Sequence, residues 1–150
     1  MSTSNKIEDR VRESSSHEQN HQIDQTALEN IGQYGYGNKG LVKYRIKELD
    51  QEWGIERVLE VNASVLSLTG LILGATVHKR WFILPGVVAT FLLQHGIQGW
   101  CPPLPVLRAL GCRSRKEIDE ERYSLKALRG DFKGLSNDTT PTKVLETIRY

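Results

Sequence analysis

Cysteine, methionine and tryptophan are scarce in this chain of 150 residues, which has 2, 1 and 3 of them respectively. Two cysteines are too few to form a disulfide framework. Cys101 and Cys112 lack the close C-x-x-C spacing and the neighbouring histidine of a structural zinc site, so we expect no bound metal and no cofactor. The formal net charge of +2 is too small to indicate binding to nucleic acid.

Charged residues are missing from two long stretches. None occurs in residues 61–77, and none occurs in residues 81–107 apart from His95, whose charge depends on pH. Most of the polar residues lie in the first sixty and the last forty positions of the chain. This uneven distribution indicates that the middle of the chain has an apolar environment, although the average composition is that of a soluble protein.

The first forty residues have few large apolar side chains and no hydrophobic periodicity. Such a segment buries too little surface to offset its chain entropy, so residues 1–40 are predicted to be a disordered polar tail. The segment also lacks the apolar core of a secretory signal, and no cleaved leader is expected.

Two apolar segments follow, and each is long enough to cross a bilayer, which takes about 20 residues. They run from about 59 to 78 and from about 81 to 100, and residues 78–80 form a short polar turn between them. Trp81 and Trp100 bound the second segment, as is typical of interface-to-interface helices. The pattern predicts an all-α protein with a two-helix transmembrane hairpin. A soluble hairpin of two buried helices is the alternative.

Amphipathic helices are predicted on both sides of the hairpin. Residues 41–60 combine apolar and basic side chains around Trp53, with a break at Gly54, and this mixture suits a membrane surface. A helix packed on a protein core is the alternative. Ser114 begins an S-x-x-E capping box ahead of a second helix over 115–128. The membrane domain is therefore expected over residues 41–132, followed by a loose C-terminal tail over 133–150.

Basic residues predict the orientation of the hairpin. The turn carries only Lys79 and Arg80. The two flanks carry more basic residues, namely Lys43, Arg45, Lys47, Arg57, Arg108, Arg113, Arg115 and Lys116. Because loops rich in lysine and arginine stay in the cytoplasm, both chain termini are expected there.

Small residues in the first apolar segment favour close helix packing. Gly70 and Gly74 are four positions apart, and Ala63 and Ser67 extend a neighbouring strip. Helices in lipid gain no hydrophobic free energy from meeting, so close backbone contact has to supply the attraction. The strip can serve packing within the hairpin, which we favour, or association between two copies of the chain.

Polar residues gather at the inner ends of both segments. At a rise of about 1.5 Å per residue, their depths in the bilayer are similar. The candidate intramembrane polar cluster consists of Glu60, Asn62, Gln94, His95 and Gln98. An ionisable residue inside a span is a functional-site hypothesis, here a Glu60–His95 pair. The alternative, which we favour, is that these residues lie at headgroup level and contact water.

The two cysteines are candidate thiols of different character. Cys112 lies beside Arg113 and just before a helix, two features that lower a thiol pKa and raise its reactivity. Cys101 emerges at the membrane surface, where apolar surroundings raise the pKa of a thiol. Arg108 is expected to reach the lipid headgroups, and the prolines at 102, 103 and 105 are expected to stop the second span.

Residues from about 53 to 132 resemble the YgaP-like transmembrane domain family of bacterial inner-membrane proteins. The resemblance rests on the Glu56–Arg57 pair in IERVLEVN, the small-residue segment LTGLILG, the short turn, and the exit GWCPPLPVLRALGC. It implies a membrane hairpin that often dimerises, alone or behind a rhodanese domain. This chain has no rhodanese domain, and neither cysteine begins a rhodanese loop, so sulfur transfer is not implied.

These observations predict a small integral protein of the bacterial inner membrane, with structural, self-association or partner-docking roles and no catalysis of its own. Its expected partners are the lipid bilayer, a second copy in a homodimer, and a protein that the sequence does not identify. One alternative is an accessory membrane protein for thiol redox or sulfur relay through Cys101 or Cys112. Another is a soluble helical protein.

Overall fold

The computed structural model describes residues 9–136 and 139–149, and every regular element in these ranges is a helix. The all-α prediction is therefore confirmed. The chain forms two compact units. The first unit takes the described residues up to 23 together with residues 53–116, and the second takes residues 24–52 and the described residues from 117 onward.

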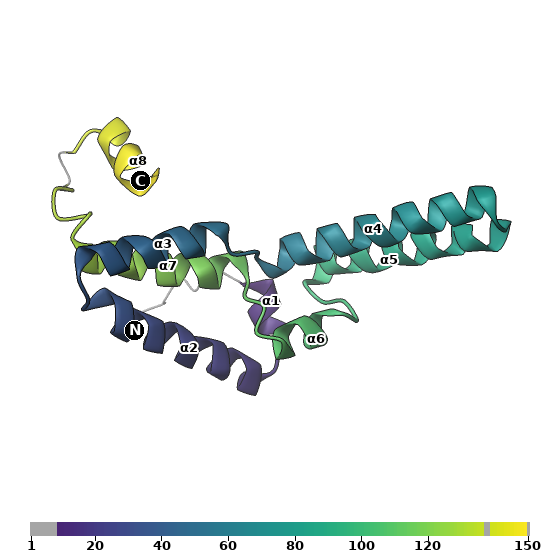
Figure 1. Ribbon diagram of the computed structural model, residues 1–150, viewed down its shortest axis with the longest axis horizontal. Coiled ribbons are helices and arrows are strands. Elements are labelled where there is room, and N and C mark those ends of the chain that lie inside the picture. Colours follow the sequence, from purple (N-terminus) through teal and green to yellow (C-terminus); the bar gives the residue numbers. More distant parts are fainter. Residues whose placement is uncertain (1–8, 137–138, 150) are drawn as a thin grey trace, which may run out of the picture. The chain divides into compact units, whose positions relative to one another are not determined.

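A helical hairpin dominates the first unit. Helix α4 (Ile55–Thr76) and helix α5 (Ile83–Gln98) lie side by side and are joined by the short 3₁₀ helix η1 (Lys79–Phe82), as Figure 1 shows. The His78 Nδ1 atom accepts the Arg80 backbone N–H at 3.1 Å and so begins the turn. The helix boundaries lie within about four residues of the predicted spans, which is ordinary for boundaries read from sequence.

The second helix of the hairpin ends at a glycine. Gly99 adopts φ 75°, and its N–H donates to the His95 carbonyl oxygen, which closes the helix in the left-handed conformation that glycine favours. The proposed stop at the prolines is therefore wrong by three residues. Pro103 and Pro105 instead begin helix α6 (Leu104–Ala109), where their fixed φ suits a first turn.

Gly54 separates the helix before the hairpin from the hairpin itself, as the sequence predicted. It precedes α4 with an extended conformation, and helix α3 (Lys39–Gln51) ends shortly before it. The Ile55 N–H donates to the Arg113 carbonyl oxygen at 2.9 Å, so the start of α4 is tied to the segment that follows α6.

The N-terminal segment differs from its prediction. Helix α1 (Arg10–Glu13) and helix α2 (His17–Gly35) occupy much of the region expected to be disordered, while residues 1–8 lie outside the described residues. Asp9 Oδ1 accepts the N–H groups of Val11 and Arg12, and Val11 enters an apolar cluster with Ile55 and Leu59. A few specific contacts therefore order a segment whose composition is poor in apolar residues.

The second unit is a small helical bundle. Helix α3 and helix α7 (Arg115–Arg129) bring together a core that consists of Val42, Ile46, Leu49, Ile118 and Leu125. The apolar faces predicted to lie on a membrane surface are therefore buried in protein, which favours the alternative reading of these helices. Gly130 follows α7 with φ 90°, as a glycine after a helix does.

The C-terminal region also contains a helix where the sequence predicted a loose tail. Helix α8 (Pro141–Arg149) begins at a proline, which is favourable at the first position of a helix. Its apolar side chains at Leu145 and Ile148 are about half exposed or less, at 49% and 37%. Their spacing of three residues places them on one helix face, a pattern that is hard to recognise in a nine-residue segment.

Candidate functional site

Gly70 and Gly74 lie in the contact between the two helices of the hairpin. A Cβ atom added at Gly70 would lie 2.6 Å from Pro85 Cδ, and one added at Gly74 would lie 2.9 Å from the Phe82 ring. Both distances are too short for real Cβ contacts. Ser67 and Ala63 are half-buried on the same helix. The structure thus uses the glycines for packing within one chain, and association between two chains would need another face.

The predicted polar cluster is only partly brought together. The Gln94 side chain donates to Gln98 Oε1 at 3.5 Å, one helical turn away, and Asn62 donates to the Val58 carbonyl oxygen at 2.9 Å. Glu60 is exposed, and within the described part of the chain no hydrogen bond or ion pair joins it to His95. A proton relay through that pair has no geometric support.

An apolar cavity of about 270 Å³ lies between α4, α5 and the exit segment. Its lining side chains are mostly aliphatic or aromatic. They belong to Leu59, Asn62, Ala63, Leu66, Val88, Phe91, Leu92, His95, Cys101, Pro103 and Leu107. Asn62 and His95 are the polar members of this lining, so two of the residues predicted from sequence meet here. An apolar site with a few polar groups is the usual form of a ligand pocket.

A second cavity of about 380 Å³ shares His95 with the first, and we name it the polar cavity for the charged residues in its lining. It lies at the end of the hairpin away from the turn, where α4 begins and α5 ends. Its lining combines charged side chains with glycine backbone. The lining residues are Asp9, Arg10, Val11, Glu56, His95, Gly96, Gly99, Ser114, Arg115 and Lys116.

Both cysteines are free thiols, and both contact the same apolar cluster. Cys101 is 3% exposed, and burial raises the pKa of its thiol, as the sequence predicted, against a smaller opposing effect of the Leu104 N–H. Cys112 is half-buried beside that cluster. Among the described residues no group of three or more histidine, cysteine or acidic side chains is placed to hold a metal ion.

Arg108 points into the protein, although the sequence predicted that it would reach the headgroups. Its side chain is 2% exposed, and it donates to Asn20 Oδ1 at 2.6 Å and to the Cys112 carbonyl oxygen at 3.3 Å. A second contact of this kind joins the Ser114 hydroxyl to Asp9 Oδ2 at 2.6 Å. No sequence pattern predicts these two pairs, because the members of each are more than eighty residues apart.

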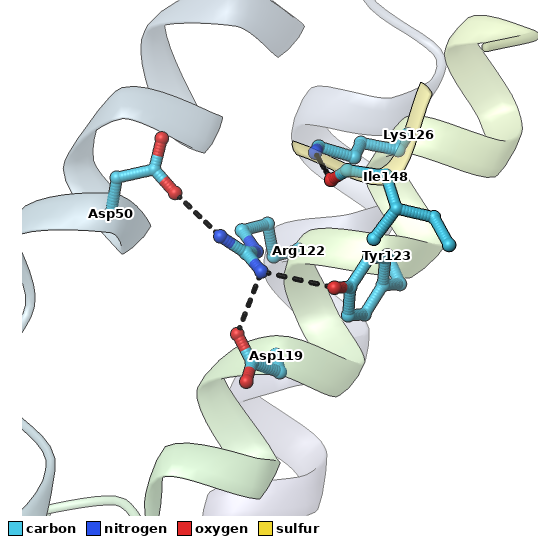
Figure 2. Close-up of polar contacts among 6 residues, drawn as sticks. All are labelled: Asp50, Asp119, Arg122, Tyr123, Lys126 and Ile148. Atoms are coloured by element: carbon cyan, nitrogen blue, oxygen red, sulfur yellow. Dashed lines mark hydrogen bonds and ion pairs between the residues drawn. The ribbon is translucent and has the colours of Figure 1, made fainter. Parts of the chain in front are cut away.

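The second unit holds a charged network on helix α7 (Figure 2). The Arg122 guanidinium donates to Asp50 at 2.9 Å and to the Tyr123 hydroxyl at 3.2 Å, and it forms an ion pair with Asp119 at 3.1 Å. Nearby, Arg45 pairs with the fully buried Glu121 at 2.9 Å. Such contacts specify how α3 and α7 align, because a misplaced pair would leave a charge buried alone.

Lys126 is a further buried charged side chain on helix α7. It is 2% exposed, and its Nζ donates to the Ile148 carbonyl oxygen of α8 at 2.9 Å (Figure 2). Burial lowers the pKa of Lys126, and the neighbouring Arg122 lowers it further. The lysine joins helix α8 to α7 within the second unit.

No family model matches the chain, and neither the curated proteins nor the solved structures contain a match. The resemblance to the YgaP-like family therefore rests on the sequence features quoted above and stays a prediction.

Replacing Gly70 with alanine is expected to destabilise the hairpin, because the added Cβ would overlap Pro85. Overpacking of this kind costs about 1–3 kcal/mol. Gly86→Ala is the matched control, since a Cβ there meets nothing within 4 Å. Thermal unfolding in detergent micelles, followed by tryptophan fluorescence, measures the difference. Equal melting temperatures for the two variants would contradict the packing role, and a changed oligomer size for Gly70→Ala alone would favour association between chains.

Cys112 is expected to react faster than Cys101 with a water-soluble maleimide at neutral pH. Cys101 is buried and its thiol pKa is raised, so little thiolate is available there. Labelling of the Cys101→Ser and Cys112→Ser variants, followed by mass spectrometry over time, separates the two rates. Faster labelling of Cys101 would contradict both its burial and its raised pKa.

The stability of the second unit is expected to rise with pH in the alkaline range, through Lys126. The folded pKa of this lysine lies below its unfolded value of 10.5, so the unfolded chain binds more protons and burial of the charge costs stability at neutral pH. That cost declines as the pH rises toward 10.5. Melting temperatures of the wild type and Lys126→Met, compared across pH by circular dichroism, test this. The melting temperature of the wild type should rise relative to that of Lys126→Met as the pH increases. A difference in melting temperature that does not change with pH would refute the role of Lys126.

Proposed function

We propose that this protein is a two-span integral membrane protein whose hairpin anchors a small helical unit for docking to a partner protein. The single observation that carries the proposal is the exposure of apolar side chains along both helices of the hairpin. The range Lys39–Thr76, which includes α4, and the range Lys79–Gln98, which includes α5, each contain a window long and apolar enough to cross a membrane. Only 17% of the apolar window in the first is buried, and none in the second, whereas a core helix of a soluble protein would be mostly buried.

Exposed apolar residues occur along the length of both hairpin helices. On α4 and α5 they include Val65, Leu68, Ile72, Ile83, Val87, Leu93 and Ile97. All of α5 belongs to the described residues, and none of its side chains is buried. Soluble proteins rarely expose continuous apolar surface on this scale, because water contact with it is unfavourable. A bilayer removes that cost.

Hydroxyl side chains on the hairpin form hydrogen bonds within their own helix. The hydroxyl groups of Ser64, Thr69, Thr76 and Thr90 each donate to the carbonyl oxygen four residues earlier, at 2.7–2.9 Å. In hydrocarbon no water is available to accept these protons, so such internal bonds lower the cost of a polar residue. They support a lipid environment for the faces that carry them.

The proposal places the protein in the bacterial inner membrane, as a YgaP-like protein with both termini in the cytoplasm. The excess of basic residues outside the turn supports that orientation. The helical unit then lies on the cytoplasmic side, since both of its chain segments lie outside the two spans.

The helical unit is the part suited to docking. Its core and its buried ion pairs give it a defined shape without the hairpin's apolar surface. Tyr44 and Leu41 lie three residues apart on α3 and are 58% and 47% exposed, as contact residues for a partner would be. The thiol alternative has less support, because Cys101 is buried and its pKa is raised.

Ile72→Arg distinguishes a membrane hairpin from a soluble one. Ile72 is 61% exposed, so in water the change would alter stability by about 0.5 kcal/mol or less. At the centre of a span, arginine instead costs about 2.5–3.5 kcal/mol of insertion free energy. We expect the wild type to stay in the membrane pellet after carbonate extraction and the variant to be degraded or released.

The matched control is Leu110→Arg. Leu110 is 74% exposed and lies outside both spans, so its replacement should leave the pellet fraction unchanged. Release of the wild type into the carbonate wash would refute the membrane assignment.

The orientation is tested by labelling Arg80→Cys in a cysteine-free chain from outside the cell. Labelling that occurs only after lysis would contradict a turn on the outer side of the membrane.

A further inference from the structure

Two cavities share one histidine in their linings. The apolar cavity lies between α4 and α5, and the polar cavity lies where these helices leave the apolar region, beside the starts of α1 and α7. His95 contributes to the lining of both. A molecule with an apolar chain and a polar head could therefore occupy the two cavities at once.

The polar cavity favours an anion. Its two carboxylates already have donors from the protein, since Asp9 accepts the Ser114 hydroxyl at 2.6 Å and Glu56 accepts the Arg115 backbone N–H at 3.3 Å. The lining also has three cationic side chains, from Arg10, Arg115 and Lys116. Cationic groups outnumber the carboxylates by three to two, and Arg10 itself donates to the Gly96 carbonyl oxygen at 3.2 Å.

His95 supplies an independent sign of a ligand. Its Nδ1 atom is buried and has no hydrogen-bond partner among the described residues. A buried polar atom without a partner is costly, and native proteins seldom leave one unsatisfied. His95 lines both cavities, and the ester groups of a lipid likewise lie between its acyl chains and its headgroup.

We propose that the two cavities bind one anionic phospholipid, an inference that rests on the membrane placement proposed above. One acyl chain occupies the apolar cavity past Leu66 and Phe91, and the phosphate lies against Arg115 and Lys116. Basic pockets between membrane helices on the cytoplasmic side are a recurring form of anionic lipid site. The apolar cavity selects a lipid over a free phosphate ion, because only a lipid fills it.

Native mass spectrometry of the full-length protein in detergent tests this proposal. Phosphatidylglycerol and phosphatidylcholine of equal chain length are added separately. Inorganic phosphate and glycerol 3-phosphate serve as probes that carry the phosphate group but no acyl chain. We expect one phosphatidylglycerol per chain, bound on the order of tenfold more tightly than phosphatidylcholine. Neither soluble phosphate should compete at the lipid concentration used.

Charge variants locate the headgroup. The double variant Arg115→Ala with Lys116→Ala should lose the preference for phosphatidylglycerol. The matched control removes two cations at the other end of the hairpin, through Lys79→Ala with Arg80→Ala, and should keep it. Ala63→Phe and, separately, Val88→Phe fill the apolar cavity and should each weaken binding of both lipids, with circular dichroism confirming that the helices persist.

Several outcomes would overturn the lipid site. They are equal binding of the two lipids, equal loss in both double variants, competition by free phosphate, and a lipid-free dimer as the dominant species. Failure of this proposal is distinguishable from failure of the proposed function. If carbonate extraction leaves the protein in the membrane while lipid selectivity is absent, only the lipid site is refuted.

Discussion

Close approach of two helices at a pair of glycines is the constraint on which the hairpin depends. Gly70 meets Pro85, and Gly74 meets the ring of Phe82, so the first helix lies directly against the start of the second. Any side chain at either glycine would separate the helices near the turn. In the membrane placement proposed above, the helices have no hydrophobic drive to associate, so this contact area has to provide much of the attraction between them.

Beyond that contact, larger side chains line the space between the helices and leave a cavity. The cavity ends at a compact exit segment, where Cys101 and Leu104 are buried with Val11 and Ile55. Buried polar contacts hold this exit, above all the one between Arg108 and Asn20. A small folded region thus connects the apolar hairpin to the polar segments of the chain. Residues of that region line part of both cavities.

The second unit is stabilised in a different way. Its apolar core is small, and its alignment depends on buried charges such as Glu121 with Arg45 and the lysine at 126. Pairs of this kind contribute little net free energy when compared with apolar residues, but breaking one is costly. A unit built in this way has a specific shape, which the docking role proposed above requires.

The sequence by itself determined the helical class, the two apolar segments and the break at Gly54, because apolar runs and glycines act through neighbouring residues. Only the tertiary structure decided which partners Arg108 and Asp9 have, that residues 10–35 are helical, and that α3 and α7 bury their apolar faces against each other. Those features depend on residues far apart in the chain, and periodicity carries no information about which distant segments meet.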